Sequence, residues 1–203
     1  MQLLYGTTNH AKLESMEAIT KPLGIELLGL HDLGREIPDI EETGKTPLEN
    51  ARIKAKAYYS LFHMPVFSCD CGLYFEGLRD EEQPGIHVRR VGGKELSDDE
   101  MISYYTSLAR QHGGRLMGRY RNAICLVLNE GMACAGIGLS LDSEPFVLVD
   151  KPHKKIVPGF PLDSLLKDPQ SDQYYYDIDD EESDSLVEQG FQRFLKEALF
   201  PAP

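Results

Sequence analysis

The chain has 203 residues, of which 41% are hydrophobic and 27% charged, and this composition predicts one globular domain rather than a disordered chain. Its 33 acidic residues outnumber the 21 Lys and Arg residues, which gives a formal net charge of -12. This charge disfavours nucleic acids and anionic membranes as partners, because both repel an acidic surface. It is still compatible with a small anionic ligand, provided that a few basic residues and a metal ion converge locally.

The first residues, Met1 to Asn9, become polar too early for a signal peptide, and no apolar run reaches transmembrane length. The four cysteines are Cys69, Cys71, Cys125 and Cys134. The first two could supply half of a zinc site, but no second pair with metal-ligand spacing follows. We therefore expect reduced, mostly buried thiols in a cytoplasmic protein.

The first third of the chain alternates predicted strands and helices. Apolar residues at helical spacing predict a helix over 13–23, which Gly24 ends. Thr46-Pro47-Leu48-Glu49 is a capping box with proline at the first helical position, so a second helix begins there and runs to about residue 62. Short apolar runs predict strands at 2–6, 25–30 and 65–69. The strand–helix–strand opening implies a parallel pair with a right-handed crossover.

The rest of the chain changes in character. Residues 74–92 predict a loop, and a second capping box at Ser97 opens a helix that ends near Gly113. Strand formers over 116–128 and 132–141 predict a hairpin, with another strand at 145–149. An irregular segment at 151–180 leads to a last amphipathic helix that carries Leu186, Phe191 and Leu199. The interleaved elements predict an α/β domain over 1–203, with a smaller β-rich lobe within about 115–165.

Acidic side chains carry the strongest sign of chemistry. Asp70 ends an apolar run that predicts a buried strand, and Gly72 can let the backbone approach a ligand closely. Glu41 and Glu42 precede the capped helix, where acidic groups are as often only partners of the helix dipole. Acids that converge on one cleft hold a hard cation or share a proton. A buried aspartate also needs a partner, which could be a metal or Lys54 of the preceding helix.

The polar turn Thr7-Thr8-Asn9 joins the first strand to the first helix. Free backbone N–H groups at such a helix start form a ready anion site, and Lys12 on the first turn can reach back to the anion. The alternative is an ordinary side-chain cap beside a solvated lysine. Arg90 is a surface charge by default, and we interpret the acidic run from Asp177 to Glu182 as a solvated helix start.

Together these segments resemble the inosine triphosphate pyrophosphatase family, which clears non-standard purine nucleotides. The matching motifs are Thr7-Thr8-Asn9-x-x-Lys12, then Glu41-Glu42-Thr43-Gly44-x-Thr46-x-x-Glu49-Asn50-Ala51-x-x-Lys54-Ala55, then Asp70-x-Gly72-Leu73 and Pro84-Gly85-Ile86. The resemblance covers roughly the first half of the chain. It implies an α/β fold with an elongated mixed central sheet, flanking helices and a two-lobed cleft. It also implies a homodimer and the use of Mg²⁺, with Mn²⁺ as a substitute.

The resemblance also assigns roles to residues. Asn9 and Lys12 would hold phosphates, Glu42 would bind Mg²⁺, and Lys54 would act at the cleft. Asp70 would be a metal ligand or the base that activates water. Further substrate-binding residues are expected at Thr7, Thr8, Gly72, Arg90, Phe160 and Asp163.

The chain departs from the family in the half that reads the base. The family's Gly-Phe-Gly-Tyr-Asp-Pro is matched only loosely by Gly159-Phe160-Pro161-Leu162-Asp163-Ser164. Its Ser-His-Arg, which reads the purine edge, falls on Val187-Glu188-Gln189, and a family lysine falls on Ser183. Cys69 replaces an aspartate, and Thr8 replaces a glycine. Since such donors set selectivity, we expect altered base specificity.

Three functions follow from the sequence. The first is Mg²⁺-dependent hydrolysis of a nucleoside triphosphate to the monophosphate and pyrophosphate, in which charge neutralisation supplies most of the catalysis. The second is a catalytically weakened module that binds a nucleotide or a partner. The third is a pyrophosphatase for pyrimidine or modified nucleotides, of the related septum-inhibitor type.

Overall fold

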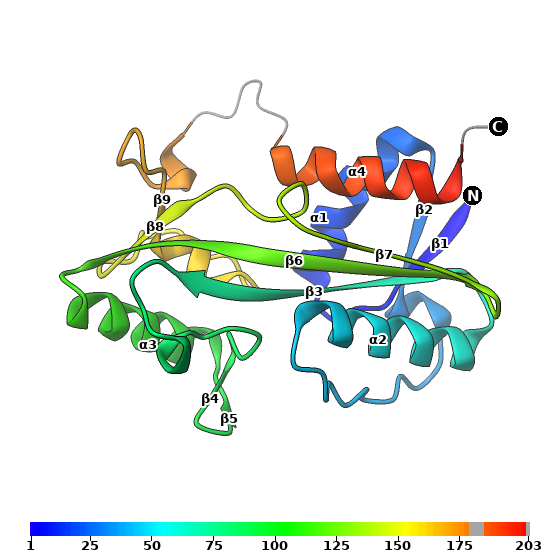
Figure 1. Ribbon diagram of the computed structural model, residues 1–203, viewed down its shortest axis with the longest axis horizontal. Coiled ribbons are helices and arrows are strands. Elements are labelled where there is room, and N and C mark those ends of the chain that lie inside the picture. Colours follow the sequence, from blue (N-terminus) through cyan, green and yellow to red (C-terminus); the bar gives the residue numbers. More distant parts are fainter. Residues whose placement is uncertain (179–184, 202–203) are drawn as a thin grey trace. The chain divides into compact units, whose positions relative to one another are not determined.

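The computed structural model describes residues 1–178 and 185–201 as a mixed α/β fold, which confirms the predicted class (Figure 1). Strand β1 pairs in parallel with β2 and β3, whereas β6 pairs antiparallel with β7 and β8. The chain forms two compact units. The first comprises Met1–Cys71, Arg121–Ser143 and the described residues of Asp184–Pro203, and the second comprises Gly72–Tyr120 and the described residues of Glu144–Ser183.

The first unit builds a sheet with the strand order β2-β1-β3-β6, to which β7 is added beside β6. Its strands are β1 (Gln2–Tyr5), β2 (Glu26–Gly29), β3 (Val66–Phe75), β6 (Arg115–Asn129) and β7 (Met132–Ile137), and β3 and β6 also contribute residues to the second unit. Its helices are α1 (His10–Thr20), α2 (Pro47–Phe62) and α4 (Leu186–Leu199). Short 3₁₀ turns lie at Lys21–Leu23 and Leu30–Leu33.

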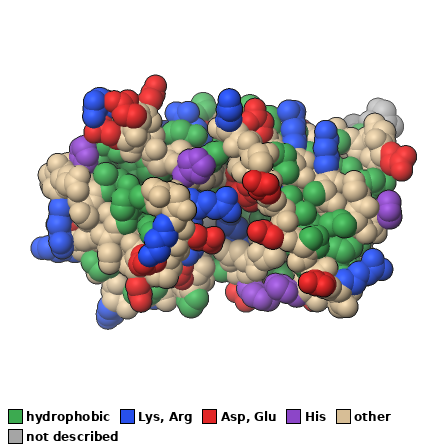
Figure 2. Space-filling view, turned by 90° about the horizontal axis from the view of Figure 1, so that it is seen from below, with side chains coloured by type: hydrophobic (Ala, Val, Ile, Leu, Met, Phe, Trp, Pro, Cys, Tyr) green, Lys and Arg blue, Asp and Glu red, His purple; other side chains and the backbone are tan. Residues whose placement is uncertain are grey.

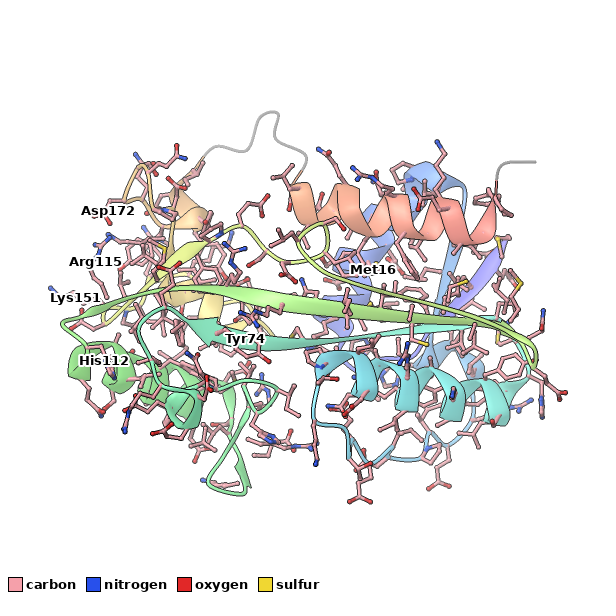
Figure 3. The ribbon with its side chains drawn as sticks, viewed as in Figure 1. Met16, Tyr74, His112, Arg115, Lys151 and Asp172 are labelled. Carbon is pink, nitrogen blue, oxygen red and sulfur yellow. The ribbon has the colours of Figure 1, made fainter. Side chains whose placement is uncertain are left out.

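Alternate side chains of these strands face two different cores, as the period of two in a strand requires. Phe67 of β3 and Ile124 of β6 pack with α1 and α4, through residues such as Met16, which is labelled in Figure 3. On the other face Val66 and Cys125 pack with Ala51, Ala55 and Tyr58 of α2. This part of the sheet is therefore covered on both faces, which explains the apolar runs at Leu3–Leu4, Val66–Phe67 and Ala123–Leu128 in its strands.

The second unit packs α3 (Asp98–Gln111) against strand residues around one core. Its further strands are β4 (Arg90–Val91), β5 (Lys94–Glu95), β8 (Phe146–Val149) and β9 (Leu166–Lys167), with 3₁₀ turns at Asp80–Glu82, Pro161–Leu165 and Tyr175–Asp177. Its core joins Tyr105 of α3 to Leu116, Leu148 and Leu165. Arg115 pairs with Asp172 at 2.6 Å, and both residues are labelled in Figure 3.

Most predicted elements are confirmed, and the differences lie between them. The first helix begins at His10, three residues before the predicted start, because Asn9 is its cap. The predicted strand 65–69 continues to Phe75, and the predicted loop 74–92 holds the 3₁₀ turn Asp80–Glu82 and strand β4. The prediction of a β-rich lobe within about 115–165 stays a prediction, as do the elongated sheet and the cleft. Two predicted features lie outside the described residues: the part of the acidic run that follows Ile178, and Ser183.

On the face drawn in Figure 2, acidic and basic side chains are interspersed among apolar ones. Within residues 1–178 and 185–201, no helix is both long and apolar enough to cross a membrane.

Candidate functional site

The loop between β1 and α1 carries the predicted phosphate-binding residues. The Asn9 side chain accepts the backbone N–H of Lys12 at 3.2 Å, so Asn9 is the N-cap of α1. The Thr7 hydroxyl accepts the N–H of Asn9 at 3.2 Å, and Thr8 is exposed. The predicted cap is therefore present. An anion role for this loop stays a prediction, and Lys12 has no ion pair among the described residues.

The segment before α2 is folded back onto the start of that helix. The Gly44 N–H donates to the Asn50 side-chain oxygen at 2.8 Å. A Cβ atom at Gly44 would lie 2.5 Å from that oxygen, so only glycine fits this approach. Thr46 caps the helix as predicted, but the Glu49 carboxylate accepts the N–H of Lys45 at 2.6 Å instead of closing the box on Thr46. These contacts hold Glu42 close to the first turns of α2.

Asp70 lies on β3, where the alternation of side chains points it to the face covered by α2. Val66 and Ser68, four and two residues before it on the strand, share that face, and the Ser68 hydroxyl donates to the Gly6 carbonyl at 3.3 Å. The Asn50 amide donates to Asp70 Oδ2 at 3.1 Å. Asp70 therefore faces the first turns of α2, the helix that precedes its strand.

Lys54 joins the two acidic segments. Its Nζ lies 2.9 Å from Glu42 Oε1 and 3.5 Å from Asp70 Oδ1. These two carboxylate oxygens can therefore be no more than about 6.4 Å apart, the sum of the two distances. The side chains are 14%, 27% and 12% exposed for Lys54, Glu42 and Asp70, so the group is largely shielded but still open to solvent. Glu41, the other member of the predicted pair, is exposed.

The charges of this group are not balanced. Burial disfavours the Lys54 ammonium, but Asp70 and Glu42 outweigh that effect and raise its pKa. Burial raises the pKa of Asp70 even though Lys54, Asn50 and Lys12 oppose this, and the Glu42 carboxylate adds to the rise. One lysine shared by two acids therefore does not return the pKa of Asp70 to its ordinary value, so the charge of Asp70 is under-compensated.

Cys69, next to Asp70, faces the other side of β3. Its thiol is hydrogen-bonded to the Tyr5 hydroxyl, and burial raises the pKa of Cys69 to about 12, although Lys12 and Lys54 lower it. The Tyr5 ring stacks on Phe67 with ring centroids 4.6 Å apart. A thiol in this setting is neutral at physiological pH and unreactive. All four cysteines, which lie within the described chain, are free.

The residues present fit a hard divalent cation better than zinc. Among the described residues, no three His, Cys, Asp or Glu side chains group together as a metal site. Mg²⁺ usually takes one or two protein carboxylates and completes its octahedron with waters and substrate phosphates. The pair of Glu42 and Asp70, with the under-compensated charge of Asp70, has the donor set for that arrangement.

Four predicted substrate-binding residues belong to the second unit, which is described here by itself. Gly72 is buried, and a Cβ there would lie 2.8 Å from the Tyr74 ring and 3.1 Å from the Gly85 carbonyl oxygen. The close approach at Gly72 is thus made by the chain's own backbone and by Tyr74, which is labelled in Figure 3. Arg90 is exposed on β4, Phe160 precedes the turn Pro161–Leu165, and Asp163 lies within it.

Asp163 has different surroundings from Asp70. No hydrogen bond or ion pair of its carboxylate is found within the described parts of the chain. Burial alone raises the pKa of Asp163 to about 6. Roles in substrate binding for Gly72, Arg90, Phe160 and Asp163 stay predictions.

Sequence reasoning missed the part that Asn50 plays. This side chain is only 2% exposed, and it holds both the loop that carries Glu42 and the Asp70 carboxylate. A signal was available, because asparagine is unfavourable inside a helix unless its amide finds specific partners.

Known proteins match a large part of this sequence. The model of the Ham1 family matches residues 3–138, which is more than half of the chain. A dITP/XTP pyrophosphatase from Leptospira interrogans serogroup Icterohaemorrhagiae serovar copenhageni (strain Fiocruz L1-130) is 41% identical over 98 residues, which cover 48% of each chain. The dITP/XTP pyrophosphatase of Symbiobacterium thermophilum is 31% identical over 131 residues, 64% of this chain and 63% of its own. The chain thus spans about half the length of the Leptospira relative.

Solved structures resemble the whole chain. A HAM1 protein from Coxiella burnetii is 25% identical and aligns over 100% of both chains with a TM-score of 0.72. The Staphylococcus aureus Ham1 protein is 21% identical over 97% of this chain and 98% of its own, with a TM-score of 0.69, and supports the fold alone.

Proposed function

Because the chain belongs to the Ham1 family, we propose that it hydrolyses a nucleoside triphosphate to the nucleoside monophosphate and pyrophosphate. The observation that carries this proposal is the arrangement of Glu42, Lys54 and Asp70, in which one ammonium lies between two shielded carboxylates. Relatives that match the chain are named dITP/XTP pyrophosphatases, which supports the same class of reaction.

In the proposed reaction, water adds to the α-phosphorus and the bond between the α- and β-phosphates breaks. Pyrophosphate leaves, the oxygen of water stays on the monophosphate, and one proton is released. Phosphoryl transfer of this kind needs positioning and charge neutralisation more than covalent help. A bound Mg²⁺ or Mn²⁺ would supply a positive charge on the phosphate oxygens and lower the pKa of a coordinated water.

The residues of this chain would divide the remaining work. Glu42 and Asp70 would hold the cation, and Asn50 would keep Asp70 in place through its amide. Lys54 would orient the two carboxylates and neutralise charge that develops on the leaving phosphates. Lys12, which has no ion pair among the described residues and is close enough to lower the pKa of Asp70, would neutralise a further phosphate.

This chain would differ from the family in how it recognises the nucleobase of the substrate. Val187, Glu188 and Gln189 occupy the positions at which the resemblance expects Ser-His-Arg. An acidic residue and an amide present different donors and acceptors from a histidine and an arginine, so base specificity would be altered. The homodimer implied by the resemblance stays a prediction.

The test is release of pyrophosphate from a panel of ITP, XTP, dITP, the four common ribonucleoside triphosphates and modified pyrimidine nucleotides. Each would be tried with Mg²⁺, with Mn²⁺ and with EDTA. Lys54→Met should abolish release, whereas Lys56→Met, an exposed lysine on the same helix, should not. If no nucleotide is hydrolysed with either metal, the proposal fails.

A second function is favoured by one observation. Cys69 stands where the family has an acidic residue, and its half-buried thiol is neutral here because desolvation raises its pKa. Loss of that carboxylate would weaken catalysis and leave a nucleotide-binding module. Thermal stabilisation by a nucleotide that is not hydrolysed would support this second function.

A further inference from the structure

Asp98, the first residue of α3, connects two segments that sequence reasoning placed at the substrate. All of these residues lie in the second unit. One carboxylate oxygen, Oδ1, accepts the Arg89 guanidinium at 2.8 Å. The other, Oδ2, accepts the backbone N–H of Gly159 at 3.0 Å. Each oxygen thus holds a different segment of the chain.

Arg89 anchors the hairpin formed by β4 and β5, which lies beside α3 in Figure 1. Its guanidinium donates to the Leu96 carbonyl at 3.0 Å, and the Leu96 N–H donates back to the Arg89 carbonyl at 2.8 Å. These bonds close the base of the hairpin. The next residue, Arg90, is exposed and pairs with Glu95 in the ladder, so its position follows from the anchor at Arg89.

Gly159 belongs to a tight turn that presents Phe160. The Phe160 N–H donates to the Val157 carbonyl at 3.0 Å, and the Phe160 carbonyl accepts the N–H of Asp163 at 3.3 Å. The bond from Gly159 to Asp98 ties this turn to the first residue of α3, and Leu162 and Leu165, which follow the turn, pack on Tyr105 of the same helix. Without it the turn would keep its internal bonds and the packing of Leu162 and Leu165 on α3, but Gly159 and Phe160 would lose the hydrogen bond that sets their distance from the hairpin.

A purely local role as a helix cap does not explain Asp98. Ser97 is the N-cap of α3, and Glu100 closes the capping box at 2.9 Å from the Ser97 N–H. Asp99 and Glu100 supply further negative charge to the first turn. Both oxygens of Asp98 are instead used by Arg89 and Gly159, and these two donors outweigh burial and lower the pKa of Asp98.

We propose that Asp98 is a positioning residue that sets the Arg90 hairpin and the Phe160 turn at a fixed spacing for substrate binding. The proposal rests on the proposed function and on the prediction, drawn from the family resemblance, that Arg90 and Phe160 bind the nucleotide. Asp98 itself does not touch the substrate. It acts through the Arg89 guanidinium and the Gly159 N–H.

The experiment compares Asp98→Ala and Asp98→Asn with Asp99→Ala, an exposed acid on the same helical turn. Loss of a hydrogen bond to a charged group changes an equilibrium constant by roughly tenfold. Asp98→Ala should therefore raise KM for the nucleotide about tenfold, with little change in kcat. Asp98→Asn keeps one acceptor and should raise KM less. Asp99→Ala should leave KM unchanged.

Two further readouts separate positioning from a merely structural effect. In a double-mutant cycle, Asp98→Ala should have a smaller effect on KM when Phe160 is already alanine. Amide hydrogen exchange without nucleotide should speed up at Gly159 and at Leu96 in Asp98→Ala, but not in Asp99→Ala. Unchanged exchange at both amides, or faster exchange with an unchanged KM, would overturn the proposal.

Failure of the proposed function would look different. If the wild type hydrolyses no nucleotide, calorimetric titration with a non-hydrolysable nucleoside triphosphate and Mg²⁺ takes the place of KM. A similar loss of affinity in Asp98→Ala alone would support the positioning role. Equal affinity of Asp98→Ala and the wild type, or no binding by the wild type, would overturn it.

Discussion

Asp70 in the first unit and Asp163 in the second are both largely buried, but they have different surroundings. Asp70 accepts the Asn50 amide at 3.1 Å and faces Lys54 at 3.5 Å, whereas Asp163 has no such partner in the described chain. Burial raises the pKa of both, to about 6 for Asp163. Only Asp70 therefore has neighbours that stabilise the ionised form.

This difference indicates two different uses of a buried acid. Asp70 is held in one orientation by donors that leave its charge under-compensated, which suits a residue that receives a cation. Asp163 can exchange a proton near neutral pH and costs folding stability when it ionises. The predictions below test whether the two acids behave as differently as their surroundings require.

The largest expected effect is that of Asp70→Asn. The amide keeps the shape of the side chain but removes the charge that would hold the cation, so kcat for pyrophosphate release should fall about 10³-fold. Thermal denaturation should show a folded protein of unchanged or higher stability, because a buried charge has been removed. Asp39→Asn, in an exposed position, is the control and should behave as the wild type.

Asp163→Asn should change stability in a pH-dependent manner. The folded-state pKa of about 6 lies above the ordinary value of 3.8, so the unfolded chain releases this proton at lower pH than the folded one. Stability is therefore lost as pH rises from about 4 through about 6, and the variant should avoid a cost of up to about 3 kcal/mol above that range. Urea denaturation at pH 4 and pH 7.5 measures this. Equal differences at both pH values would contradict it.

Asn50→Ala should have an intermediate effect. It removes the amide that holds Asp70 and leaves the Gly44 N–H without its acceptor. Removing a group that is hydrogen-bonded to a metal ligand typically lowers metal affinity about 10–100-fold. The concentration of Mg²⁺ needed for half-maximal activity should therefore rise at least about tenfold. The free energy of unfolding should fall by about 1–3 kcal/mol. Arg52→Ala, an exposed change on α2, should do neither.

The smallest effect is expected at Cys69. Since burial raises the pKa of this thiol to about 12, it should resist alkylation at pH 8 in the folded protein and react only in urea. Peptide mapping after iodoacetamide treatment measures the labelled fraction. Fast labelling of the folded protein would show that the Tyr5 contact does not shield the thiol.

Much of the fold and of the candidate site was predictable because the relevant signals are local. Caps at Thr46 and Ser97 fixed the starts of α2 and α3. Glu42, Lys54 and Asp70 lie within 29 positions of one another on a loop, a helix and the strand that follows it. Such a unit brings its strand face and helix face together without help from the rest of the chain, so their meeting was expected.

The features that the sequence did not predict depend on contacts between segments that are distant in the chain. The continuation of β3 to Phe75 goes with the bonds between Leu73 and Gly85, twelve residues apart, which no pattern in the strand itself predicts. The double role of Asn50 appears only when the loop before α2 folds back onto it. Asp98 was identified as part of a capping box, but its link to Gly159 spans 61 positions.

The charge of the cluster has a consequence for the order in which ligands arrive. Glu42, Lys54 and Asp70 carry one excess negative charge, and Lys12, which is close enough to lower the pKa of Asp70, brings the sum of the four to zero. A free nucleoside triphosphate would therefore meet little long-range attraction there, whereas one divalent ion would turn the same cluster into a dication. Under the proposed function, the polyanion and its counter-ion would then enter as a single complex, and uncomplexed nucleotide would be a poor competitor.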